Sequence, residues 1–126
     1  KVMLAASLAA ATSDTFSSEF GTLYGKRFRN ILTFKPDVRG QDGVISLEGI
    51  AWGLAGSAMV AIVFALGLGL SWAVGIILVA GVLANLMDSL LGASLQRLGL
   101  MNNHSVNFTT TLIAALLVRI AWEMIA

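Results

Sequence analysis

The sequence predicts an all-α protein, a polytopic membrane bundle of about four transmembrane helices. Of its 126 residues, 57% are hydrophobic and only 12% are charged, and the mean hydropathy is +0.85. Soluble domains are about 45–50% apolar and about 25% charged, so this composition is typical of a membrane protein. We therefore predict a single membrane domain over residues 1–126, as part of a longer helical bundle.

The middle of the chain is too long and too apolar for one crossing. From Gly49 to Met87 there is no Asp, Glu, Lys or Arg. One helix of that length would extend about 58 Å, nearly twice the hydrocarbon core of about 30 Å. Because Gly67 and Gly69 weaken a continuous helix, we predict one span over 47–67 and a second over 72–94.

Two further spans are predicted at the ends of the chain. Residues 106–126 are predicted to form one of them, and its Arg119 and Glu123 lie four residues apart and can pair with each other. Residues 1–24 are predicted to form a helix that is apolar in its first half and polar in its second half. Counting this helix as a span gives four crossings.

The orientation follows from the loop over residues 25–46. It contains five of the eight Lys and Arg residues, and the positive-inside rule places such a loop in the cytoplasm. We expect a multi-pass protein of a bacterial plasma membrane. This topology brings most of the unusual polar residues to one side of the membrane.

Asp14 and Glu19 are the acidic residues of the first helix. A carboxylate at the centre of a membrane helix costs about 2.5–3.5 kcal/mol on insertion scales, so it usually has a function. With Ser and Thr hydroxyls nearby, two acids can hold a hard cation such as Mg²⁺. The alternative is a polar patch whose hydrogen bonds are satisfied within the bundle.

A polar stripe follows one face of the span over 72–94 and continues beyond it. Its members recur at i, i+3, i+4, i+7 and i+11, and they are Asn85, Asp88, Ser89, Gly92 and Gln96. Such a stripe is expected to face the bundle interior. It indicates either a functional site containing Asp88 or a hydrogen-bonded seam between helices.

The loop over 25–46 combines basic residues with a glycine-containing turn before a helix. Lys26, Arg27 and Arg39 supply charge, the turn supplies main-chain N–H groups, and Ser46 can cap the next helix. A polyphosphate needs these features. Basic loops are also expected from topology alone, so the charge by itself does not establish a site.

Several function classes have little support. The chain has no cysteine, which excludes disulfide scaffolds and thiolate metal sites. His104 is the only histidine, so a histidine-based zinc site or a Ser-His-Asp triad is not favoured. A net charge of +1 gives no argument for nucleic-acid binding.

Several motifs together resemble one known family. SDTFSSEFG (13–21), GKRF (25–28), RGQDGVISLEG (39–49), ANLMDSLLGASLQ (84–96) and NNHSVNF (102–108) occur in order over nearly the whole chain. They are similar to the integral-membrane family that contains phytyl-phosphate kinase and transmembrane protein 19. Members of that family have further spans upstream, so this chain resembles a second half. More loosely, it resembles CTP-using membrane enzymes such as dolichol kinase.

The resemblance implies a nucleotide and Mg²⁺ site. The residues it implies are Asp14, Glu19, Asp42, Gly43, Ser46, Asp88, Asn102, Asn103 and Asn107. We expect Mg²⁺ to be held by Asp14, Glu19 and Asp88, and the phosphates to be neutralised by Lys26, Arg27 and Arg39.

The activity expected from this site is phosphorylation of a prenyl or phytyl monophosphate by CTP or another nucleotide. The lipid tail is expected beside Gly49, Gly53 and Gly56. Upstream spans or a second copy of the chain are expected partners. The alternatives are a cytidylyltransferase that forms a CDP-lipid, and a non-catalytic membrane subunit.

Overall fold

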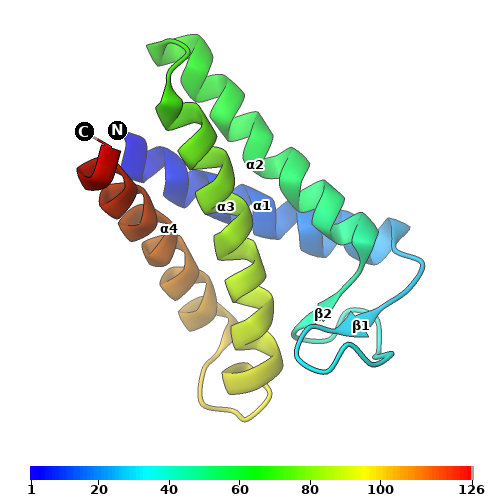
Figure 1. Ribbon diagram of the computed structural model, residues 1–126. Helices are drawn as coiled ribbons and strands as arrows, with labels where there is room; N and C mark the ends of the chain where they lie inside the picture. The colour runs from blue at the N-terminus through cyan, green and yellow to red at the C-terminus, as the bar shows by residue number, and fades with distance from the viewer. Residues whose placement is uncertain (126) are drawn as a thin grey trace.

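The computed structural model describes residues 1–125 and confirms the all-α membrane bundle. Its four long helices are α1 (Val2–Tyr24), α2 (Leu47–Leu68), α3 (Trp72–Leu91) and α4 (Asn103–Ile125), and a π-helical turn, η1 (Gly92–Gln96), continues α3. Figure 1 shows α2 and α3 as antiparallel neighbours, α4 beside α3, and α1 crossing behind α2 and α3.

Three of these helices are long and apolar enough to cross a membrane: α2, α3 together with η1, and α4. The first helix, α1, is not among them, because its second half is polar. It nevertheless runs the length of the bundle. Its first residues line a pocket with Trp122 near the end of α4, while Gly21 near its own end meets Gly49 at the start of α2.

The core is built from small side chains with α1 at its centre. One buried cluster joins Ala6 and Ala10 of α1 to alanines of α3 and α4, and a second joins Ala5 and Ala9 to Ala61 and Ile77. Large apolar side chains such as Leu66, which is 83% exposed, point outward. Small residues inside and large apolar residues outside are typical of helices that pack within lipid.

Glycines of both α1 and α2 allow these two helices to approach closely. A Cβ atom at Gly21 would lie 2.7 Å from the Cα of Gly49, and one at Gly53 would lie 3.2 Å from the Ser13 hydroxyl. At Gly56 a Cβ atom would lie 2.7 Å from a main-chain oxygen of α1. The expectation that a lipid tail lies on this glycine surface is therefore wrong, because α1 covers it.

The loop over 25–46 folds into a short hairpin that the sequence did not predict. Its strands are β1 (Arg29–Asn30) and β2 (Val44–Ile45), paired antiparallel. Gly43 precedes β2 with φ of +75°, and a Cβ atom there would collide with Ala93 of η1. A glycine at this position therefore lets the hairpin lie directly against η1.

Candidate functional site

A cavity of about 290 Å³ lies where the hairpin meets the helices. Its walls come from the second half of α1, residues 40–46, the start of α2, the end of α3 with η1, and Asn103 of α4. Of the predicted site residues, six line this cavity: Asp14, Asp42, Gly43, Ser46, Asp88 and Asn103.

One face of α1 forms a wall of the cavity. Its lining residues, at i, i+3, i+4, i+7 and i+8, are Asp14, Ser17, Ser18, Gly21 and Thr22. Glu19 is exposed and does not line the cavity, because a residue five positions beyond Asp14 is rotated by about 140° around the helix. The expected cluster of Asp14, Glu19 and Asp88 is therefore not formed.

The polar stripe of α3 and η1 forms the opposite wall. All five of its predicted members, from Asn85 to Gln96, line the cavity. The side chains of Asp88 and Asp14 lie within hydrogen-bonding reach of each other. The Thr110 hydroxyl of α4 lies 3.5 Å from the Asp88 carboxylate. Two carboxylates from different helices therefore face each other across the cavity.

The third wall is the segment over residues 40–46. It contains the glycine turn, and the buried Ser46 ends it as the N-cap of α2. Its hydroxyl oxygen accepts a hydrogen bond from the Gly49 N–H group at 3.0 Å. Peptide groups at a glycine turn and a helix N-terminus together present partial positive charge to an anion.

The basic residues of the loop lie outside this lining. Lys26, Arg27 and Arg39 are exposed, and the Arg39 guanidinium carbon lies 5.7 Å from the centre of the Phe28 ring, which itself lines the cavity. In the described chain the lining contains three Asp residues and no Lys, Arg or His. The positions of these three side chains therefore do not support the expectation that they neutralise phosphates in the cavity.

The asparagines before and within α4 have different surroundings. Asn103 lines the cavity, whereas Asn102 accepts the Ser105 N–H group at 2.8 Å and so caps the start of α4. Asn107 lies one turn further on, in a smaller chamber between α1 and α4.

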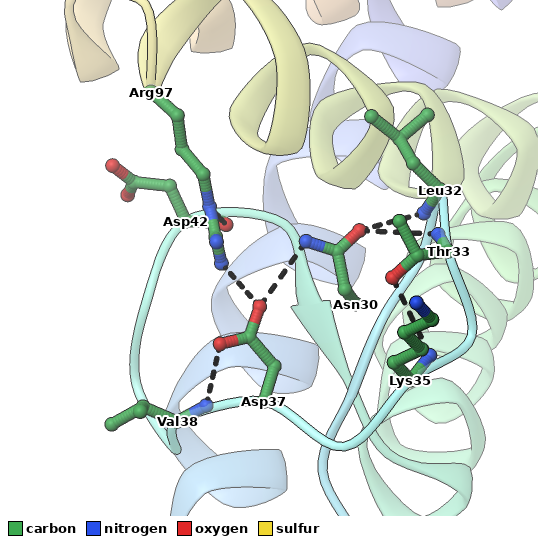
Figure 2. A network of polar contacts seen from close by, with 8 residues as sticks. All are labelled: Asn30, Leu32, Thr33, Lys35, Asp37, Val38, Asp42 and Arg97. Carbon is green, nitrogen blue, oxygen red and sulfur yellow. Dashed lines mark hydrogen bonds and ion pairs between the residues drawn. The ribbon is translucent and has the colours of Figure 1, made fainter.

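Arg97, just after η1, fastens the hairpin to the helices (Figure 2). Its Nη2 atom lies 2.8 Å from the Asp37 carboxylate, and its Nε–H group donates to the main-chain oxygen of Asp42 at 2.7 Å. Asn30 donates to the same carboxylate at 3.1 Å. The pKa of Asp37 is held below its usual range, mainly by the Val38 N–H group and also by Asn30 and Arg97. Asp37 therefore stays ionised at neutral pH.

The oxygen ligands that line the cavity fit a magnesium ion whose remaining ligands are phosphate oxygens and waters. Mg²⁺ is commonly bound through one or two carboxylates, with phosphate oxygens and waters completing its shell. Asp14 and Asp88 supply two such carboxylates, and Ser17, Ser18 and Ser89 supply hydroxyl oxygens. Within residues 1–125, no group of three or more His, Cys, Asp or Glu side chains is placed to hold a metal by itself.

Comparison with known proteins gives matches over most of the chain. Residues 1–115 match the family described as integral membrane protein DUF92. An uncharacterized membrane protein of Methanocaldococcus jannaschii is 39% identical over 114 residues, which make up 88% of this chain and 47% of that protein. An uncharacterized membrane protein of Synechocystis is 37% identical over 113 residues, 87% of this chain and 43% of that protein.

A plant protein is also similar. The chloroplastic protein VTE6 of Arabidopsis thaliana is 41% identical over 91 residues, 71% of this chain and 27% of that protein. The chain thus spans less than half the length of each of these three relatives. No solved structure matches it.

Proposed function

The chain belongs to the DUF92 family of integral membrane proteins, and we propose that it carries the magnesium–nucleotide site of a kinase that phosphorylates a prenyl monophosphate. The proposal rests on one observation. Asp14 of α1 and Asp88 of α3 converge on a cavity whose third wall is formed by residues 40–46. CTP is the donor that the resemblance to CTP-using membrane enzymes favours.

The polyphosphate would lie along residues 40–46. Peptide N–H groups of the glycine-containing turn would bind phosphate oxygens there, while Ser46, whose hydroxyl already accepts the Gly49 N–H group, fixes the start of α2. Asp14 and Asp88 hold Mg²⁺ on the opposite side. When bound, the ion neutralises charge on the phosphates and in the transition state.

The chemistry needs little beyond positioning and charge neutralisation. The acceptor phosphate is already anionic near neutral pH, so the protein need not supply a general base. Because no described Lys, Arg or His lines the cavity, the chain itself offers no side chain to neutralise a triphosphate. We therefore expect an absolute requirement for a divalent cation.

The test is an assay of the purified full-length protein with a prenyl monophosphate, CTP and Mg²⁺. We expect prenyl diphosphate and nucleoside diphosphate as products. The Asp14→Asn and Asp88→Asn variants should each lose about 100-fold or more, because each removes a ligand of the ion that stabilises the transition state. Glu123→Gln, an exposed carboxylate on α4, is the control and should behave like the wild type.

The products also separate the alternatives. Pyrophosphate and a CDP-lipid would identify a cytidylyltransferase instead. Full activity in both Asp variants would contradict the proposed site. If magnesium and CTP gave neither product nor thermal stabilisation of the protein, a non-catalytic subunit would explain the chain better.

A further inference from the structure

A second chamber, of about 90 Å³, lies between α1 and α4 and shares Asp14 with the cavity described above. Besides Asp14 and two alanines, it is lined by Thr15 of α1 and by Asn107, Thr110 and Thr111 of α4. A chamber of this size is large enough for a small hydrated ion, since a single water needs only about 10–15 Å³ by the same kind of measure.

The threonine hydroxyl groups of this chamber have acceptors for their protons in the helix main chain. Thr15 donates its hydroxyl proton to the Ala11 carbonyl at 2.9 Å, and Thr111 donates to the Asn107 carbonyl at 3.0 Å. Thr110 donates to the Val106 carbonyl at 3.1 Å. With those protons directed to the main chain, the hydroxyl oxygens can still accept hydrogen bonds or coordinate a cation.

Asn107 adds an acceptor with no partner. Its side-chain oxygen Oδ1 is buried and makes no hydrogen bond to any described residue. Buried polar atoms without a partner are rare and need an explanation, such as a bound ion or water. No Lys, Arg or His among the described residues lines the chamber.

We propose that this chamber is a second cation site, distinct from the magnesium–nucleotide site, and that it binds a hard metal ion, Na⁺ or Mg²⁺. Its ligands are the Asp14 carboxylate, Asn107 Oδ1 and the hydroxyl oxygens of Thr15 and Thr111. Carboxylate, amide and hydroxyl oxygens are the ligands that such ions prefer. A cation here also compensates the charge of Asp14, which faces a second carboxylate at Asp88.

The experiment measures the thermal stability of the full-length protein without nucleotide. The background salt is choline chloride, because oxygen ligands cannot directly coordinate a nitrogen that is surrounded by carbon substituents, and NaCl or MgCl₂ is titrated in separate arms at constant ionic strength. We expect the melting temperature to rise with one of the two ions, because a ligand that binds only the folded state stabilises it. The ion that produces the rise identifies the occupant.

Two variants test the assignment. Asn107→Leu removes the unpartnered oxygen, and Thr111→Val removes a hydroxyl with little change of shape; both should lose the cation-dependent rise. Thr109→Val is the matched control, because Thr109 makes the same kind of bond to the helix main chain, at 2.7 Å to Ser105, but does not line the chamber. This control should keep the rise.

The following results would overturn the proposal. Stability that is the same in choline, sodium and magnesium would mean that water alone fills the chamber. A rise that survives both Asn107→Leu and Thr111→Val, or one that is lost in Asp88→Asn but kept in Asn107→Leu, would place the ion elsewhere. Because no nucleotide is present, the result does not depend on whether the protein is a kinase.

Discussion

Arg97 has no direct contact with the cavity, yet it holds the cavity wall in place. Its guanidinium uses two different nitrogens for two different partners, the Asp37 carboxylate and the main-chain oxygen of Asp42. Asp42 is bound through its main-chain oxygen, and it also lines the cavity. A lysine has a single ammonium group and cannot reproduce this planar, two-pronged arrangement.

We predict that Arg97→Lys and Arg97→Gln weaken nucleotide binding by displacing residues 37–43. Hydrogen bonds to a charged group contribute about 1.5–3 kcal/mol, so the KM for the nucleotide should rise about 10-fold or more. The change in kcat should be smaller, because Asp14 and Asp88 keep their places. Steady-state kinetics at saturating magnesium measure both values.

The chain offers a matched control at Arg119, whose partner Glu123 lies four residues along the same exposed helix face at 3.1 Å. Exposed pairs of this kind contribute little. Arg119→Gln should therefore leave both kinetic values unchanged. If Arg97→Gln behaves in the same way, the guanidinium does not position the wall.

At the level of helices, the sequence predicts the features that follow from helical periodicity, namely the spans and the polar stripe. The predicted spans over 47–67 and 72–94 agree with α2 and α3 to within a few residues, and the stripe from Asn85 to Gln96 lines the cavity as expected. Glu19 is grouped with Asp14 because both acids lie in one polar segment and because the family resemblance implies both, although the same periodicity rotates Glu19 away from the cavity.

Other features depend on contacts between distant segments. Asp37 and Arg97 are 60 residues apart, and no local pattern in the sequence pairs them. The hairpin forms because its main chain bonds to itself and lies against η1, which periodicity cannot show. The directions of Lys26, Arg27 and Arg39 likewise depend on how the loop folds, and charge alone does not predict them.

The contact between α1 and α2 leads to a prediction about stability. A Cβ atom at Gly21 would meet the main chain of α2, which cannot move aside as a flexible side chain can, so Gly21→Ala should destabilise the fold by about 1–3 kcal/mol. Gly75 in α3 has no atom within 4 Å of an added Cβ atom, and Gly75→Ala should stabilise by about 0.5–1 kcal/mol. Reversible unfolding in mixed micelles compares the two; equal effects would contradict the close contact.

At the level of the whole molecule, the position of α1 explains its composition. It packs against α2, α3 and α4, with its buried alanines in both core clusters. One face of its polar half, from Asp14 to Thr22, lines the cavity, so this part of the helix does not need an apolar surface all around. Hydropathy along the sequence therefore does not identify α1 as part of the bundle. Its neighbours carry large apolar side chains on their outer surfaces.

The arrangement of the helices also predicts the topology of the protein in the membrane, and the absence of cysteine from the chain makes this prediction easy to test. The hairpin and the turn after η1 lie at the same end of the bundle, because Arg97 joins them, while the turn between α2 and α3 lies at the opposite end (Figure 1).

With the basic hairpin in the cytoplasm, single cysteines at Thr33 and Leu98 should react with a membrane-impermeant maleimide only after cells are permeabilised. A cysteine at Leu70, which is 88% exposed, should react in intact cells. The opposite pattern would invert the protein in the membrane and place the proposed nucleotide site away from cytoplasmic CTP. Labelling of Thr33 and Leu98 from different sides would contradict the fold itself, since the ion pair between Asp37 and Arg97 requires both segments at one surface.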